Sequence, residues 1–218
     1  MSAATAPAPI VSKKPRRPYA AGRQAAPPFP IPAPGEAVCV GLGNWETYLM
    51  LDGALCDRGF RVRFHRGKIE IMSISFTHEA IKAALRLLIE AFCDWKELDF
   101  IAWGSTTQKV ETEMGGEPDE SYTFGSTRGR KPEMVLEVAL SSGGIEKLPF
   151  WAEKAIPEVW IWQNGRLHLF GFHKGTYAPL SQSKCLSGFP IPLAEELLPM
   201  EPTSKAVREF RRRLSAGK

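Results

Sequence analysis

The sequence predicts an α/β or α+β domain in which helices flank a mixed central sheet, and three observations lead to this fold class. The segment 77–94 carries apolar residues at spacings of three and four, as an amphipathic helix does. The segments 61–73 and 132–140 arrange their apolar residues as strands do. Asn164-Gly165 separates two further strand-like runs and is typical of a two-residue hairpin turn. Helical and strand patterns therefore alternate along the chain, which favours helices packed around one sheet.

The ends of the chain differ in composition from its middle. Residues 1–35 are rich in Pro and Ala and contain five basic residues but no acid, so we predict a disordered basic tail. Residues 201–218 are predicted to form a basic C-terminal helix or tail. The net charge of the chain is +4, so the part between these basic ends is acidic. Basic tails either attract nucleic acid non-specifically or keep a protein soluble, whereas the acidic middle argues against a broad DNA-binding face.

Residues 36–200 are predicted to form one folded domain, because a chain of 218 residues with 44% hydrophobic content can bury one good core. The four cysteines form no CxxC pair and lack metal-finger spacing, so we expect reduced thiols and a cytoplasmic location. No apolar run approaches the roughly 18 residues of a membrane span, so we expect no membrane association. The N-terminal residues also lack the apolar segment of a signal peptide.

The first half of this domain is predicted to contain a short helix, a hairpin and a long helix. The short helix begins at Asn44, which suits an N-cap. The hairpin over 61–73 turns at residues 65–67. In the long helix Thr77 is the expected N-cap, and His78 leans toward the packed face because apolar residues follow it at three and seven positions.

The second half is predicted to contain three strands, a helix and a meander. The strand-like runs span 100–110, 117–124 and 132–140. A helix over 145–155 can hold Pro149 only in its first turn and must end before Pro157. The strands of the meander span 158–163, 166–172 and 176–180, and a basic helix over 204–214 follows.

Carboxylates on two of these strands are the candidate site. Strand side chains alternate between faces, so Glu133 and Glu137 share one face of the strand 132–140, whose other face is uniformly apolar. If the preceding strand pairs with this one, Asp119 and Glu137 converge. Clustered carboxylates repel one another unless a cation lies between them, and hard oxygen ligands suit Mg²⁺ or Mn²⁺. The alternative is an ordinary strand with a solvated face.

Four segments resemble, in this order, those of a known family: GKIEIMSISFTHE, EPDESY, PEMVLEVALSS and EKLPFWAEKAIPEVW. Over residues 45–195 the chain is similar to the Uma-type family of restriction endonucleases, small bacterial proteins of the PD-(D/E)xK nuclease superfamily. The resemblance implies a restriction-endonuclease-like core, to which the C-terminal hairpin and meander are added. It also implies a divalent ion held by two strand carboxylates, and a lysine that positions or activates water.

The resemblance assigns three candidate metal ligands. Asp119 matches the aspartate of the family's PD element, and Glu137 matches the glutamate of its EV element. Glu133 stands where the family commonly has Asp, so it keeps the charge but reaches one methylene further.

Two further residues complete the catalytic set of Asp119, Glu137, Lys147 and His78 that the resemblance implies. Lys147 matches a basic position at the start of the helix that follows the EV strand. The superfamily's E-x-K lysine would fall at Ala139, so Lys147 is expected to supply the ammonium group from the helix instead. His78 matches a position in the family's histidine stretch, and a core or helix-capping role is its alternative.

The function that follows is a Mg²⁺-dependent DNA endonuclease that hydrolyses phosphodiester bonds, with DNA as its partner and a homodimer as one assembly compatible with the family. The alternative is a catalytically weak or inactive nuclease-fold protein that binds nucleic acid or a partner protein. Ala139 and the acidic body favour this alternative. A structural protein recruited by its basic tails is the third reading.

Overall fold

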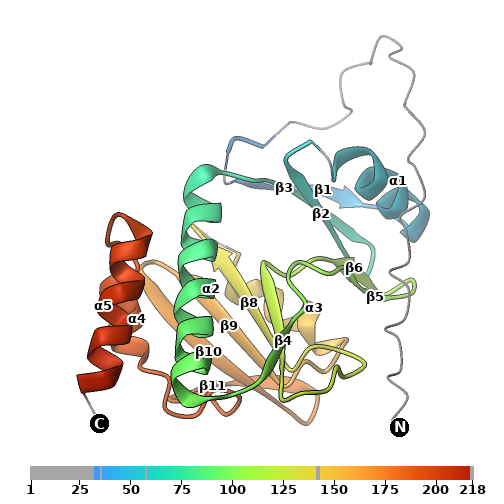
Figure 1. Cartoon of the computed structure of the whole chain (residues 1–218). Coiled ribbons are helices and arrows are strands. Elements are labelled where there is room, and N and C mark those ends of the chain that lie inside the picture. The colour runs from blue at the N-terminus through green and yellow to red at the C-terminus, as the bar shows by residue number, and fades with distance from the viewer. Residues whose placement is uncertain (1–31, 35, 57, 141–142, 217–218) are drawn as a thin grey trace, which may run out of the picture.

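The computed structural model describes residues 32–34, 36–56, 58–140 and 143–216. The predicted disorder of residues 1–35 lies outside the described residues except at 32–34, and it stays a prediction. In the described part, two sheets and their helices make up the folded unit (Figure 1).

The six-stranded sheet, here called the large sheet, has the strand order β11-β10-β9-β8-β7-β4. Its strands are β4 (Phe100–Ala102), β7 (Glu120–Phe124), β8 (Met134–Ala139), β9 (Glu158–Gln163), β10 (Arg166–His173) and β11 (Thr176–Leu180). β8 and β9 are parallel, whereas the other pairs are antiparallel. The large sheet is therefore mixed, and the predicted fold class is confirmed. The predicted hairpin and meander are β9, β10 and β11, with Asn164 and Gly165 at positive φ in the first turn.

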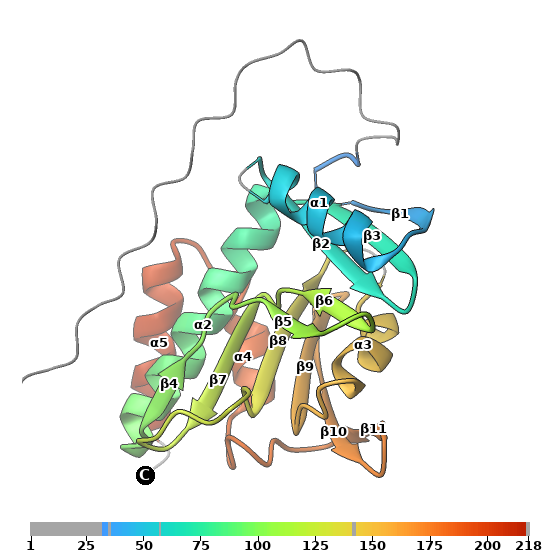
Figure 2. The ribbon, with the colours of Figure 1, turned by 90° about the vertical axis from the view of Figure 1, so that its right-hand side faces the viewer.

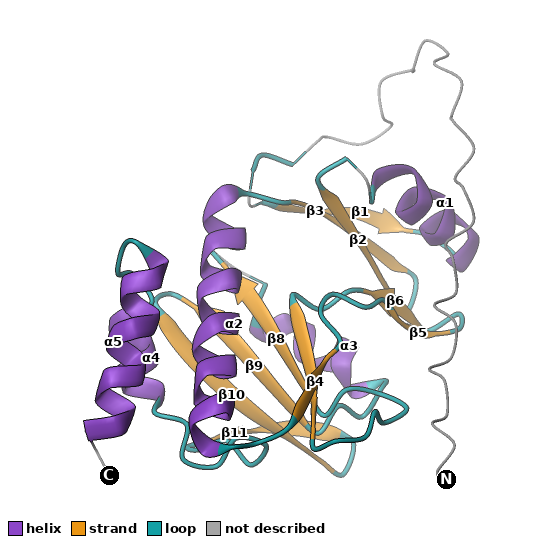
Figure 3. Ribbon diagram, viewed as in Figure 1, coloured by secondary structure: helices purple, strands orange, loops and turns teal. Residues whose placement is uncertain are grey.

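The five-stranded sheet, here called the small sheet, has the order β1-β3-β2-β6-β5 and is antiparallel throughout. Its strands are β1 (Ala37–Leu42), β2 (Phe60–His65), β3 (Lys68–Ser73), β5 (Gln108–Val110) and β6 (Met114–Gly116). Figure 3 shows this sheet lying across the upper end of the large sheet. The described strands form two sheets and not the single one predicted, since the hairpin of β2 and β3 lies in the small sheet and the segment 100–110 is split between the two. Gly104, at φ 58°, lies where the chain leaves β4 and crosses to β5.

Helices α1 (Trp45–Leu55) and α2 (Phe76–Lys96) begin at side-chain caps. Asn44 caps α1 as predicted, since its side chain accepts a hydrogen bond of 2.8 Å from the Thr47 backbone N–H. In α2 the cap is Ser75 and not Thr77, because the Ser75 hydroxyl accepts from the His78 backbone N–H at 3.2 Å. The long helix therefore starts two residues earlier than predicted, and His78 is its third residue.

One face of the large sheet is covered by α2, α4 (Ile191–Leu197) and α5 (Thr203–Ala216), as Figure 2 shows on its left side. Their core includes Met134, Leu136 and Val138 of β8. The predicted C-terminal helix is present as α5, and its residues Phe210 and Leu214 are buried in this same core. Residues 201–216 are thus packed into the domain that was predicted to end at 200.

The opposite face of the large sheet is covered by α3 (Leu148–Ala152) and the 3₁₀ turn η1 (Ile145–Lys147). The predicted helix over 145–155 is thus shorter and begins as a 3₁₀ turn, with Pro149 in the first turn of α3. Phe150 and Trp151 pack there against Val135 of β8 and its neighbours. Both faces of β8 are therefore buried, which rules out the solvated face considered from the sequence.

Candidate active site

Strand pairing brings the carboxylates of Asp119 and Glu137 to the same end of the large sheet. Asp119 immediately precedes β7, and its backbone N–H donates to the Leu136 carbonyl of β8 at 3.1 Å. Its Oδ2 accepts from the backbone N–H of Val138, the residue after Glu137, at 2.6 Å. Both carboxylates are buried, at 0% exposure for Asp119 and 1% for Glu137. A charge buried this deeply is stable only when partners compensate it.

Lys147 is one compensating cation, and it comes from the element predicted to carry it. Its Nζ donates to Glu137 Oε2 at 2.7 Å, from the last residue of η1. Trp151 Nε1 donates to the other oxygen, Glu137 Oε1, at 3.0 Å. Ala139 offers no polar group at the expected lysine position, so the ammonium group reaches Glu137 from the turn before α3.

Two arginines of β2 complete the compensation, and the sequence reasoning missed both. Arg61 Nη1 forms a very short ion pair with Asp119 Oδ1. Arg63 Nη2 lies 3.4 Å from both oxygens of Glu137. A signal for them exists in the RVRFH run, where basic residues alternate with apolar Val62 and Phe64 as on a strand with one core face. The sequence does not say which partner this basic face meets.

His78 connects Asp119 to the edge of the site. Its Nε2 lies 3.2 Å from Asp119 Oδ2, and its Nδ1 lies 3.2 Å from Glu79 Oε1. Burial opposes protonation of His78, but the neighbouring Asp119 outweighs it and raises the pKa of His78 above its usual value. Burial likewise opposes ionisation of Asp119, but His78 and Arg61 outweigh it and hold the pKa of Asp119 well below its usual range. Asp119 is therefore a carboxylate at neutral pH.

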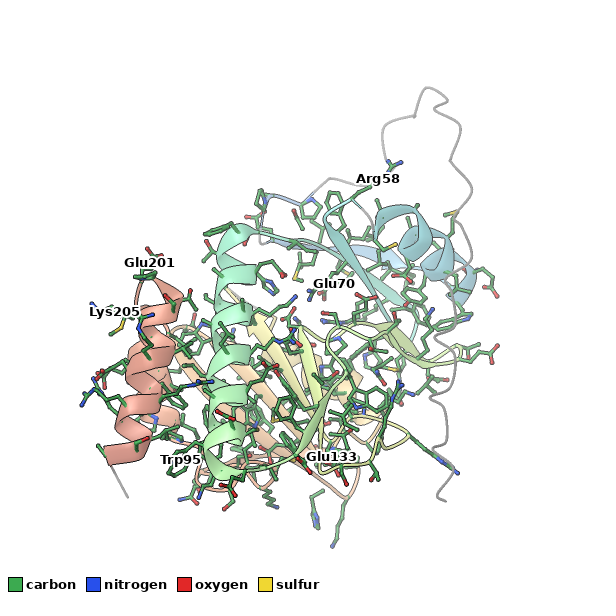
Figure 4. All side chains as sticks on the ribbon, viewed as in Figure 1. Arg58, Glu70, Trp95, Glu133, Glu201 and Lys205 are labelled. Carbon is green, nitrogen blue, oxygen red and sulfur yellow. The ribbon has the colours of Figure 1, made fainter. Side chains whose placement is uncertain are left out.

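Glu133 does not join this group, contrary to its prediction as a metal ligand. Its Oε2 accepts a hydrogen bond of 2.8 Å from the Phe124 backbone N–H, at the opposite end of β7 from Asp119. Figure 4 shows Glu133 at the lower end of the large sheet, far below Glu70. β8 begins at Met134, one residue after Glu133, and four residues of extended chain separate Glu133 from Glu137 by about 13 Å.

A cleft of about 420 Å³ opens beside the two carboxylates. It lies between the small sheet, the start of α2 and the end of β8. Its lining includes Glu70, His78, Ala139 and Lys147. A second hollow of about 460 Å³ lies beside β11 and is lined by none of these residues. The cleft is thus lined by Lys147 and His78, which contact Glu137 and Asp119, whereas a third hollow of about 270 Å³ is lined by Arg61 and Glu79.

The chemistry of the two carboxylates suits a hard divalent ion. Asp119 and Glu137 supply carboxylate oxygens, which Mg²⁺ and Mn²⁺ prefer. Within the described part of the chain, no group of three or more His, Cys, Asp or Glu side chains is placed to hold a metal ion. Two carboxylates are nevertheless a common protein contribution to a Mg²⁺ site, since the ion usually keeps several waters and takes further oxygens from substrate phosphates.

A comparison with protein families gives one match. The family model Uma2, described as "Putative restriction endonuclease", matches residues 45–206, which is most of the chain and contains every residue of the site. No curated protein matches the chain significantly. Among the described helices, none has both the length and the apolar character that crossing a membrane requires.

Proposed function

This chain belongs to the Uma2 family of restriction endonucleases, and from that membership we propose that it is a metal-dependent DNA endonuclease. The family description supports a nuclease, and hence a nucleic-acid substrate. DNA as the nucleic acid, Mg²⁺ or Mn²⁺ as the ion and Lys147 as the assisting cation are our proposals. The observation that carries them is the buried carboxylate pair Asp119 and Glu137 with Lys147 at 2.7 Å, beside an open cleft.

In this proposal Asp119 and Glu137 hold the ion. When bound, such an ion supplies Lewis acidity that activates water and offsets charge at the phosphate. Lys147 lines the cleft and holds an ammonium group beside Glu137, where it can orient a water or a phosphate oxygen. His78 is a positioning residue, because it contacts Asp119 and fixes the orientation of that carboxylate.

Nicking of supercoiled plasmid tests the proposal. Purified protein should nick DNA in Mg²⁺ or Mn²⁺ and not in EDTA, and Asp119→Asn should abolish nicking because it removes a metal ligand. Glu133→Gln is the matched control, since Glu133 lies at the far end of the strand. The amide oxygen of the new glutamine can still accept the hydrogen bond from the Phe124 backbone N–H. Nicking that survives Asp119→Asn, or that is lost equally in Glu133→Gln, would refute the site assignment.

A second candidate function is a nuclease-fold protein that binds nucleic acid without cutting it. It is favoured by the full compensation of both carboxylates, each of which already contacts a positive side chain. DNA binding that is indifferent to divalent ions, with no nicking at any tested metal, would decide for this function.

Location and assembly also remain proposals. We propose a cytoplasmic protein, which is consistent with the four free cysteines of the described chain, and a homodimer as its assembly. Light scattering on the purified protein measures the assembly directly, and a monomeric mass at micromolar concentration would exclude the dimer.

A further inference from the structure

Arg61 and Arg63 lie on one face of β2, and that face points away from the strand's own core. The intervening Val62 and the next apolar residue, Phe64, belong to the core under α1. Both guanidinium groups are largely buried, with side-chain exposures of 14% and 13%. The small sheet thus extends two fixed positive charges into the site of the large sheet, one to each carboxylate.

The carboxylates of the site are already paired with cations. Asp119 and Glu137, both buried, face Arg61, Arg63 and Lys147. The two arginines also pair with Glu79 and Glu70, each 38% exposed. A divalent ion added alone would create a large excess of positive charge in a site shielded from water, which is unfavourable. A phosphodiester brings negative charge, so it reduces that excess while it gives the guanidinium groups a new partner.

The guanidinium group of Arg63 has N–H groups that donate no hydrogen bond within the described part of the chain. Among the described residues, its buried Nε and Nη1 have no hydrogen-bond partner. Its contacts with Glu137 are long, at 3.4 Å, and Nη1 lies 3.5 Å from Glu70 Oε1. Glu70 lines the cleft, and Figure 4 shows it below the small sheet near the upper end of β8. Arg63 itself does not line the cleft, so its unpaired N–H groups lie one residue away from it, next to Glu70. Such groups suit a phosphate, which accepts hydrogen bonds from a planar guanidinium at two oxygens.

We propose that Arg61 and Arg63 are exchangeable counter-ions. They neutralise the two carboxylates while the cleft is empty, and they bind the phosphate oxygens of a nucleic-acid backbone when it enters. Their departure exposes the carboxylate oxygens to the divalent ion. Ion and phosphate therefore bind cooperatively, and each raises the affinity of the site for the other by the same factor. This inference rests on the proposed function, because it assigns the coupling between that function's ion and its substrate.

Mn²⁺ binding, followed by electron paramagnetic resonance, tests the exchange without any turnover. Arg61→Gln should bind Mn²⁺ alone more tightly than the natural protein, by about 5-fold or more, because Asp119 has lost its competing cation. A short phosphorothioate DNA duplex, which resists hydrolysis, should tighten Mn²⁺ binding to the natural protein by a similar factor and to Arg61→Gln much less. Equal or weaker Mn²⁺ binding by Arg61→Gln, or an equal effect of the duplex on both proteins, would overturn the proposal.

Three further variants make the result specific. Arg63→Gln should change Mn²⁺ affinity in the same direction, and it provides the test if Arg61→Gln does not fold. Arg66→Gln is the matched control, because Arg66 lies in the same hairpin and pairs with Glu153 at 2.7 Å but is 67% exposed and outside the site. Its Mn²⁺ affinity should equal that of the natural protein, and a rise as large as that of Arg61→Gln would overturn the proposal.

Asp119→Asn should lose Mn²⁺ binding. Retention of binding in that variant would refute the metal site itself, whereas its loss beside an unchanged Arg61→Gln would refute only the exchange.

Discussion

Lys147→Met should destabilise the protein far more than the loss of an ordinary surface lysine. The side chain of Lys147 is 7% exposed and that of its partner Glu137 is 1% exposed, so the variant leaves a buried carboxylate without its nearest cation. Removing one partner of a buried ion pair costs about 3–5 kcal/mol. We expect the lower end of this range, because Trp151 at 3.0 Å and Arg63 at 3.4 Å still contact the carboxylate. For a chain of this size, about 3 kcal/mol corresponds to a Tm lower by about 6–12 °C.

Urea denaturation of a double-mutant cycle measures this effect. Glu137→Gln in the Lys147→Met background removes the unpaired charge, so the double variant should be more stable than the sum of the single losses predicts, by about 1 kcal/mol or more. Lys68→Met, at an exposed position of β3, is the matched control and should change the free energy of unfolding by less than about 0.5 kcal/mol. Additive losses, or a Lys147→Met variant as stable as this control, would refute the buried pair and with it the placement of Lys147.

Two other predictions concern parts of the domain outside the site. Glu158→Ala should lower the free energy of unfolding in urea by about 3 kcal/mol or more, because the buried carboxylate accepts hydrogen bonds from two side chains and two backbone N–H groups that would lose their partner; a loss below 1 kcal/mol would contradict it. In a thiol count with Ellman's reagent at pH 8, exposed Cys39 and Cys56 should react quickly, whereas Cys93 and Cys185 should react only after unfolding. Burial raises the pKa of Cys93 to about 11 and also raises the pKa of Cys185, so neither forms much thiolate, and four fast thiols in the native protein would contradict this.

The sequence predicts those parts of the fold that local spacing determines. The alternation in 132–140 correctly divided β8 into two faces, and Asn164-Gly165 correctly marked a hairpin. Alternation predicts the face on which a side chain lies, however, and not how far along the strand it is from the site. Glu133 lies at the end of the sheet away from Asp119, although alternation alone grouped it with Glu137.

Contacts between distant segments are what the sequence could not supply. Arg61 and Asp119 are 58 positions apart, and Arg63 and Glu137 are 74 positions apart. Their meeting depends on how the small sheet lies across the large one, and no local spacing encodes that arrangement. The family resemblance identified the carboxylates and Lys147, but it did not identify the arginines that compensate them.

The small side chain of Ala139 leaves room for the turn that begins at Gly144. Gly144 packs so closely on β8 and β9 that a Cβ there would lie 3.1 Å from Ala139 Cβ and 2.7 Å from Ile161 Cγ2. The Gly144 carbonyl accepts the Lys147 backbone N–H at 3.1 Å, so this close contact is the start of the turn that carries the lysine. A lysine side chain at 139 would emerge where that turn now packs. The small residue at 139 therefore makes room for the segment that brings the Lys147 ammonium group to Glu137 on the same face of β8.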